Sequence, residues 1–446
     1  MNWRNKFNVL LIFFCLFLLC NQSKAERFPD GKTIDTWFSD TTMLDPSTLG
    51  RFYVISDYGA VGDGKTLNTS IIQKVINLAA DSGGGVIVIP QGRFLTGALF
   101  FKPGTHLHVR KKGVLLGADQ IKNFPIGPSR IEGQSIDYFP AVVNAYGVDG
   151  FSISGEGTID GNGLNYWKAF WQRRKENPRC TNLEVSRPRL IFIRDSKNVC
   201  LQQVHLQNSG FWTTHIYKCS RIKILGVSIT SPVKPVKAPS TDAIDLDVCS
   251  DVLIDGCYLS VNDDAIALKG GKGPLANKNP DDGPNRDIII QNCHFGFCHS
   301  AVTCGSESIH DRNLIVRNCL VDGAGRVLRL KNRPDTPQLY EYILVEGIHG
   351  SADRLLDANP WRQFFNLHGR EHLLLSESDH ISFRNIDLKC KIFVDVNVTD
   401  DDRLKNFSFE NMTITATNGL LDPRLFDGIQ LKNVQVNGKQ LTADNK

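Results

Sequence analysis

The sequence predicts an all-β protein folded as a parallel β-helix, a solenoid in which each coil stacks its strands on those of the next. The main observation is a recurring segment of β-branched residues, which mostly ends in a polar-Asn or polar-Gly step and a small or apolar residue. Such segments are NVCLQQV (198–204), RIKILGV (221–227), DVLIDGC (251–257), DIIIQNC (287–293), NLIVRNC (313–319), YILVEGI (342–348), HISFRNI (380–386), NFSFENM (406–412) and GIQLKNV (428–434). Their last residues are 22 to 38 residues apart, which is the spacing of solenoid units.

Two further observations exclude other solenoids. The segments are too short and too β-branched for helices, which need apolar residues spaced by three and four over a longer run. The leucine pattern of leucine-rich repeats is missing. Cys257, Cys293 and Cys319 occupy the same phase of their segments, so we expect them to stack inside the core as small buried side chains rather than form disulfides.

The repeat is interrupted by insertions that indicate a binding face. One is the Gly/Pro/Asn-rich loop KGGKGPLANKNPDDGPNR, within residues 269–286. Another is the aromatic and basic stretch 162–189, which we expect to wall a groove. Loops that lengthen on one side of a solenoid usually line its binding surface.

The N-terminal part differs from the repeats. Residues 69–80, TSIIQKVINLAA, have the pattern of an amphipathic helix with Ile72, Val75, Ile76 and Ala79 on one face. Because an open solenoid end exposes core and strand edges, we interpret this helix as a cap. Strands are expected to follow at GGVIVIP and GTHLHVR.

The first 25 residues are typical of a secretory signal peptide. Arg4 and Lys6 precede the apolar run Val9 to Cys20, which is shorter than the roughly 20 residues that span a bilayer, and small residues precede Glu26. We therefore expect a leader over 1–25, one β-helix domain over 26–446, and a secreted monomer of the extracellular space or cell wall, free of the membrane once the leader is removed. Sequons that fit secretion and glycosylation occur at Asn68, Asn397, Asn406 and Asn411.

Charge and cysteine content exclude some functions. The formal net charge of +4 falls to about +1 without the leader, because the leader holds three basic residues and no acid. Nucleic-acid binding through bulk charge is therefore not supported. Ten cysteines lie outside the leader, without a CxxC pair, so we expect no zinc site.

Acidic residues stand where apolar strands would normally exclude them. The stretch STDAIDLDVCSDVLIDGCYLSVNDDAIALKGG (240–271) contains Asp242 and the adjacent Asp263 and Asp264. Since Asp242 and Asp263 are 21 residues apart, close to one coil, we expect their carboxyl groups on neighbouring coils. Both members of the adjacent pair can face one groove only at a bend or strand end. Four other aspartates of the stretch we interpret as turn or surface residues: Asp245, Asp247, Asp251 and Asp255.

The chain resembles the polygalacturonase family of glycoside hydrolases, pectin-degrading right-handed parallel β-helices. The resemblance covers roughly residues 52–435, through YGAVGDGKT, GGGVIVIPQGRFLTG, SRPRLIFI and QNSGFWTTHIYKC. The family's four short catalytic signatures, NTD, DD, GHG and RIK, are matched in order by STD (240–242), DD (263–264), CHS (298–300) and RLK (329–331). Ser240 replaces an Asn, both glycines around His299 are missing, and a tyrosine common downstream of RIK has no match, since no Tyr follows Tyr342.

The resemblance implies roles for the matched residues. Asp263 is expected to be the general acid, with Asp242 and Asp264 holding the attacking water and His299 tuning the acid. Arg329 and Lys331 alternate on one strand and so share a face, where two cations suit a uronic-acid carboxylate. The implied mechanism is inverting hydrolysis, for which one protonated carboxyl and one carboxylate are needed, roughly 6.5–9.5 Å apart.

The resulting hypothesis is a cofactor-free, metal-free hydrolase of α-1,4-galacturonosyl linkages in polygalacturonate, an acidic polysaccharide. Exo attack is plausible because the insertions 162–189 and 270–287 can close one end of a groove. The alternatives are a rhamnogalacturonan hydrolase, a pectate lyase-like enzyme that uses Ca²⁺, and an inactive carbohydrate-binding β-helix.

Overall fold

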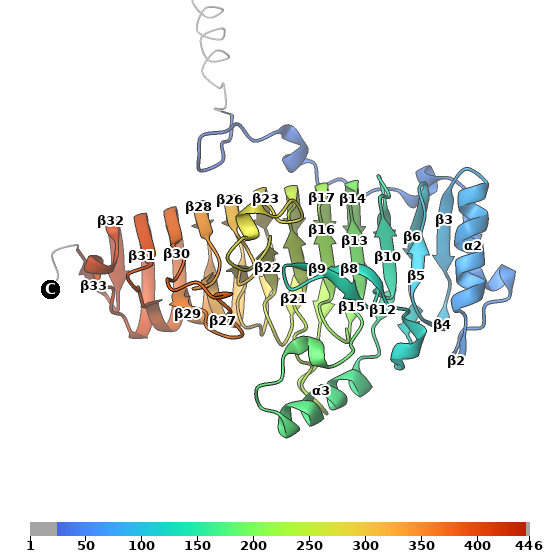
Figure 1. The fold of residues 1–446 in the computed structure, drawn as a ribbon. Coiled ribbons are helices and arrows are strands. Elements are labelled where there is room, and N and C mark those ends of the chain that lie inside the picture. Colours follow the sequence, from blue (N-terminus) through green and yellow to red (C-terminus); the bar gives the residue numbers. More distant parts are fainter. Residues whose placement is uncertain (1–24, 443–446) are drawn as a thin grey trace, which may run out of the picture.

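The computed structural model describes residues 25–442 and shows one long solenoid of stacked parallel strands (Figure 1). The predicted leader lies outside the described residues except for Ala25. No helix of the described part has both the length and the apolarity that crossing a membrane would require.

The first of three strand stacks contains every predicted repeat segment. In order of pairing, it consists of β1 (Phe52–Val54), β3 (Gly85–Ile89), β6 (Thr105–Val109), β11 (Ser152–Ser154), β14 (Lys197–Gln202), β17 (Ser220–Leu225), β20 (Ser250–Asp255), β23 (Asn285–Gln291), β26 (His310–Arg317), β28 (Gln338–Glu346), β30 (Ser376–Val396), β31 (Asp402–Asn418) and β32 (Asp427–Val436). The register is constant: Ile224 pairs with Ile254, which pairs with Ile290. The predicted parallel β-helix is therefore confirmed.

The polar-Asn or polar-Gly step of each repeat turns the chain out of this stack. The residue at the step has a left-handed backbone in all nine segments, with φ between 52° and 65° at Gln203, Gly226, Gly256, Asn292, Asn318, Gly347, Asn385, Asn411 and Asn433. Glycine adopts this conformation freely, and Asn tolerates it better than most residues. The repeat pattern is thus the signature of a corner.

The other two stacks complete each coil. The second contains β2 (Asp63–Leu67), β4 (Gly92–Thr96), β7 (Gly113–Gly117), β12 (Thr158–Asp160), β15 (His205–Gln207), β18 (Ser228–Thr230), β21 (Tyr258–Ser260), β24 (His294–Phe295), β27 (Leu320–Asn332) and β29 (His349–Pro360). The third contains β5 (Leu99–Phe101), β10 (Val143–Tyr146), β13 (Ile191–Arg194), β16 (Thr214–Tyr217), β19 (Ile244–Asp247), β22 (Ile266–Lys269) and β25 (Val302–Cys304), followed by the later parts of β27 and β29. A short β33 (Lys439–Leu441) pairs antiparallel with β32.

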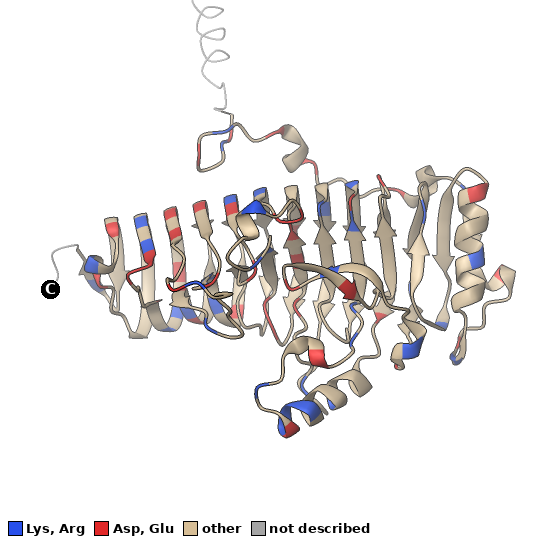
Figure 2. Cartoon of the chain, viewed as in Figure 1, with Lys and Arg blue, Asp and Glu red and all other residues tan. Residues whose placement is uncertain are grey.

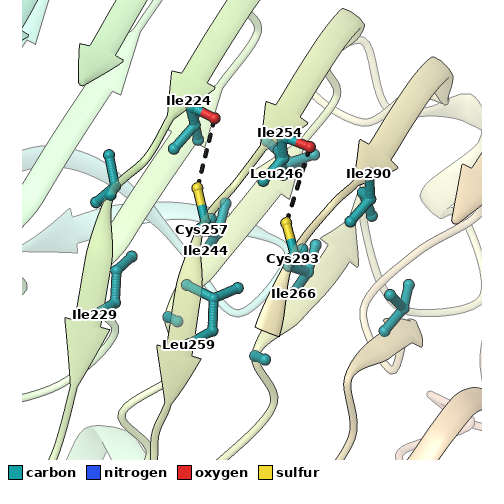
Figure 3. Packing of buried hydrophobic residues seen from close by; sticks show 14 of the residues in the cluster. Ile224, Ile229, Ile244, Leu246, Ile254, Cys257, Leu259, Ile266, Ile290 and Cys293 are labelled. Carbon is teal, nitrogen blue, oxygen red and sulfur yellow. Dashed lines mark hydrogen bonds between the residues drawn. The ribbon is translucent and has the colours of Figure 1, made fainter. Parts of the chain in front are cut away.

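The core lies inside the coils and is a column of aliphatic side chains with interspersed cysteines (Figure 3). Cys257 and Cys293 lie on successive coils, and their thiols point to the backbone carbonyls of Ile224 and Ile254 at 3.5 and 4.0 Å. Cys319 is equally buried, and the ten cysteines of residues 25–442 are all free thiols. The predicted buried stacking of these cysteines is confirmed.

Within residues 25–442, two α-helices and a hairpin are attached to the solenoid. Helix α2 (Thr69–Asp81) lies beside β3 at the N-terminal end, with the predicted residues Ile72, Val75, Ile76 and Ala79 buried (Figure 1); its capping role stays a prediction. Helix α3 (Leu164–Glu176) is part of the predicted insertion and lies below the coils in Figure 1. The antiparallel hairpin of β8 (Gly127–Ile131) and β9 (Gln134–Tyr138) crosses in front of the third stack.

An N-terminal segment, residues 26–40, runs along the outside of the first stack (Figure 1). Phe28 and Phe38 cover a stripe of outward-facing apolar residues from five successive coils: Leu225, Leu253, Ile289, Ile315 and Leu344. Ion pairs fix the segment on either side, between Lys32 and Asp287 at 2.7 Å and between Asp40 and Lys223 at 2.7 Å. No sequence pattern indicated this contact.

One predicted glycosylation site is incompatible with the fold. Asn68 is fully buried, and its amide nitrogen donates to the carbonyls of Val61 and Thr66 at 3.0 and 2.7 Å. The sequon at Asn68 is therefore a structural element. The side chains of Asn397, Asn406 and Asn411 are exposed, and glycosylation there stays a prediction.

Candidate active site

The three predicted aspartates meet where the second stack turns into the third. Asp242 lies just before β19, and Asp263 and Asp264 lie in the bend between β21 and β22, one coil further on. One carboxylate oxygen of each lies within 4.8 Å of those of the other two. Neighbouring coils thus bring them together, and the adjacent pair occupies a bend, as the sequence indicated.

Asp264 is held ionised by the two cations of the RLK strand. It is fully buried, which alone would raise its pKa, but Lys331 and Arg329 lower the pKa below the ordinary value. The Lys331 ammonium is 2.6 Å from Oδ2 of Asp264. Both cations lie on β27 and, as expected, on one face: Arg329 Cζ and Lys331 Nζ lie 5.0 and 4.8 Å from the ring centre of Trp361.

Asp263 is the most accessible of the three carboxyl groups. Its side chain is 27% exposed, compared with 5% for Asp242 and 0% for Asp264. His299 lies beside it, with Nδ1 3.1 Å from Oδ1 of Asp263. The structure thus places His299 next to one aspartate of the site, on the side open to solvent.

Asp242 belongs to a buried charge cluster that the sequence did not reveal. Its pKa is raised well above the ordinary value by burial and by the negative charges of Asp263 and Asp245. The ammonium of Lys269 lies 3.7 Å from Asp242, 3.6 Å from Asp245 and 3.4 Å from Glu307. The one sequence feature that could have predicted this cluster is the lysine at the end of the apolar strand IALK, because a buried cation needs carboxylate partners.

Two aspartates that we interpreted as turn or surface residues, Asp245 and Asp247, are fully buried, so that prediction is wrong for both. They point outward from β19 but are covered by other parts of the chain. Arg130 on β8 donates from Nε to Oδ2 of Asp247 at 3.0 Å. The hairpin therefore buries a face that would otherwise be solvated. Asp251 and Asp255 are partly exposed, as expected.

The acids open into a pocket with a volume of about 400 Å³. Its floor includes Asp242, Asp263, His299, Arg329 and Lys331, and Asp264 lies directly beneath. One wall comes from α3, and the loop after β29 adds Trp361 and Phe364 to the lining. The stretch predicted to wall a groove thus lines this pocket, as does Lys272 of the Gly/Pro/Asn-rich loop. The structure brings all six predicted site residues together.

The aspartate trio is also the group between residues 25 and 442 whose carboxylate oxygens are close enough to share a metal ion. Lys331 already supplies a positive charge at Asp264, and burial together with the charges of Asp263 and Asp245 raises the pKa of Asp242, which favours its protonated form. A protonated carboxyl is a poor metal ligand, because metal ligands must be deprotonated. We therefore assign no metal to the site.

Comparison with known protein families identifies the family of this chain. Residues 89–338 match the model of glycosyl hydrolases family 28. The chain belongs to that family. The matched region contains the six predicted site residues.

Several curated proteins with pectin-related names are similar to the chain. A probable polygalacturonase of Vitis vinifera is 31% identical over 224 residues, which are 48% of this chain and 43% of that protein. An endo-polygalacturonase of Pectobacterium parmentieri is 29% identical over 66% of this chain and 71% of its own. An exopolygalacturonase of Platanus acerifolia is 23% identical over 65% and 69%. The chain spans less than half the length of the Vitis relative.

Solved structures share the fold. The exopolygalacturonase from Thermotoga maritima superposes with a TM-score of 0.71 at 22% identity, over 88% of this chain and 93% of the other. The polygalacturonase from Erwinia carotovora ssp. carotovora gives 0.60 at 21% identity, over 84% and 95%. This family 28 member is therefore a parallel β-helix over most of its described length.

Proposed function

We propose that the protein is a pectin-degrading glycoside hydrolase that cleaves α-1,4-galacturonosyl linkages. The observation that carries the proposal is the meeting of three carboxyl groups from neighbouring coils with two cations in one pocket. The family and the names of its relatives support the same substrate class.

In this mechanism Asp263 donates the proton. Its accessible carboxyl protonates the glycosidic oxygen as the bond from that oxygen to the anomeric carbon breaks, and His299 orients the acid through Nδ1. Ionised Asp264 holds the attacking water by accepting a hydrogen bond. As the water oxygen bonds to the anomeric carbon, the ionised Asp264 takes the proton that the water loses, and Asp242 helps to hold the water through a hydrogen bond.

The cations select an acidic sugar. Arg329 and Lys331 form one edge of the floor, beside the stacking surface of Trp361. A guanidinium binds a carboxylate through charge-assisted hydrogen bonds in a planar geometry. Trp361 lies downstream of RLK, so it supplies an aromatic surface in the part of the chain that lacks the family's tyrosine.

Inversion of the anomeric centre rests on the family resemblance alone. The nearest carboxylate oxygens, within 4.8 Å of one another, are closer than the roughly 6.5–9.5 Å between carboxyl groups typical of inverting glycosidases. Proton NMR of the first product formed from trigalacturonate decides the question, because inversion of an α-linkage gives the β-anomer first.

The central test is hydrolysis of polygalacturonate by the purified full chain in EDTA, read as new reducing ends. Asp263→Asn is expected to reduce kcat by about 10²–10⁴-fold, the usual contribution of a general acid. Asp322→Asn, an exposed aspartate outside the pocket, is the matched control and should retain full activity.

Other outcomes select the alternatives. Products that carry a new double bond and form only with Ca²⁺ would establish a lyase. Binding of oligogalacturonates without turnover would establish a carbohydrate-binding protein. Faster cleavage of rhamnogalacturonan would change the substrate. Release of single sugars from the start would establish exo attack, for which the α3 wall and the loop around Trp361 provide support.

Secretion, removal of residues 1–25, a single catalytic domain over 26–446 and a monomeric state belong to the same proposal. They fit an enzyme whose polymeric substrate lies outside the cell. Mass spectrometry of protein recovered from the medium of expressing cells tests the new N-terminus at Glu26.

A further inference from the structure

The α3 wall of the pocket contains basic groups that have no acidic partner. Seven lysine and arginine side chains line the pocket. Five have a carboxylate within 4.0 Å: Lys269, Lys272, Arg329, Lys331 and Arg333. Arg174 and Lys237 have none among residues 25–442. Both unpaired cations are therefore free to take an anion from the pocket.

These two cations are held by an aromatic framework. Arg174 lies over the ring of Phe170, with Cζ 5.3 Å from the ring centre, and donates from Nη1 to the carbonyl of Pro178 at 3.0 Å. Phe170 is itself fixed because the buried Arg187 guanidinium lies between it and Phe211, 4.4 and 4.2 Å from the ring centres. The guanidinium of Arg174 is thus partly preorganised.

Trp171 connects the helix to the loop that carries Lys237. Its indole Nε1 donates to the backbone carbonyl of Lys237 at 2.7 Å, while its ring, 38% exposed, lines the pocket. An accessible flat apolar surface that lines the same pocket as two unpaired cations suits a sugar ring that carries a carboxylate. Figure 2 shows that the C-terminal half of α3 is rich in basic residues.

We propose that Arg174, Lys237 and Trp171 form a binding site for a galacturonate ring of the substrate, with the carboxylate on the two cations and the ring against the indole. This inference rests on the proposed function, since it takes galacturonan as the substrate class. It assigns specificity for the unesterified acid to the α3 wall as well as to the floor.

The test measures binding of trigalacturonate by calorimetry in the inactive Asp263→Asn background. Arg174→Gln and Lys237→Gln are each expected to weaken binding about tenfold, as loss of a hydrogen bond to a charged group does. The matched controls are Lys175→Gln on the same helix and Lys234→Gln on the same loop, both exposed and outside the pocket lining, which should leave binding unchanged.

Two further readouts distinguish recognition of a carboxylate from a structural role. Arg174→Lys should recover part of the affinity, because it keeps the charge but not the planar guanidinium. The weakening of binding between 50 and 500 mM NaCl should be smaller for Arg174→Gln than for its parent. Equal affinity of Arg174→Gln and Lys175→Gln, or the same salt dependence of binding in Arg174→Gln and its parent, would overturn the proposal.

The outcomes also separate this inference from the proposed function. If the parent hydrolyses polygalacturonate but Arg174→Gln binds trigalacturonate normally, the α3 binding site is rejected and the proposed hydrolase function stands. If trigalacturonate binding depends on Arg174 but the protein hydrolyses no galacturonan, the α3 binding site is supported and the proposed hydrolase function is rejected.

Discussion

At the scale of single residues, Asp245 shows how burial sets charge. Neither of its carboxylate oxygens has a hydrogen-bond partner among the described residues, and its side chain is fully buried. Burial raises its pKa to about 8, although Lys269 acts in the opposite direction. Protonation of Asp245 removes one negative charge beside Asp242, so that the two close acids do not repel each other.

Asp245→Asn therefore changes the pH dependence of stability. Between pH 4 and 8 the folded protein retains a proton that the unfolded chain releases, so this group makes stability fall as pH rises through that window. Asn cannot titrate. Thermal unfolding at pH 5, 6, 7 and 8 should show that the Tm of the variant rises relative to that of the parent as the pH increases. A Tm difference that stays constant with pH would contradict the raised pKa of Asp245.

Lys331 provides the second prediction at this scale. Lys331→Met leaves the buried Asp264 carboxylate without its closest cation and should lower the free energy of unfolding by about 3–5 kcal/mol. Adding Asp264→Asn should restore part of that loss, because no unpaired charge is then buried. Urea unfolding of the parent, both single variants and the double variant measures the coupling, and strictly additive losses would disprove it.

The predictability of the site also differs from residue to residue. Asp242, Asp263, Asp264, His299, Arg329 and Lys331 follow from short motifs in order along the chain. The burial of Asp247 depends on a hairpin more than a hundred residues earlier in sequence, and no local sequence pattern indicates that contact. Lys269 and Glu307 are visible in the sequence only as ordinary charged residues.

At the scale of elements, the left-handed corners explain why the repeat could be read. A position with φ near +55° in coil after coil selects Asn or Gly, and that selection is visible without a structure. Helix α2 was predictable for a similar reason, since its apolar spacing is local. The length and position of α3 were not, because its apolar residues Tyr166, Trp167 and Phe170 pack against parts distant in sequence.

A corner substitution tests this explanation. Asn318 is exposed and has φ of 53°. Asn318→Val should cost about 1–2 kcal/mol of unfolding free energy, the usual price of a left-handed backbone in an L-residue, and more because valine is β-branched. Asn318→Gly should be nearly neutral. Equal midpoints of urea unfolding for the two variants would show that the left-handed backbone at this corner does not disfavour valine.

At the scale of the whole molecule, residues 26–40 bind several coils at once. Phe38 is 4% exposed and packs edge-to-face on Phe28, with ring centres 5.5 Å apart. Phe38→Ala should lower the free energy of unfolding by about 3–5 kcal/mol, as for other buried phenylalanines. Phe297→Ala, at an exposed phenylalanine, is the control and should shift it by about 0.5 kcal/mol or less. Similar losses of unfolding free energy for the two variants would mean that residues 26–40 contribute little to the stability of the protein.

A solenoid can unwind turn by turn, because each coil touches only its neighbours. Residues 26–40 prevent this for the coils between Leu225 and Leu344, because separating any one of these coils also breaks its packing against Phe28 or Phe38. Those coils carry the pocket, and they should open as a single block. Fraying should begin instead at the far C-terminal turns, so amide hydrogen exchange ought to reach β31 and β32 long before it reaches β20.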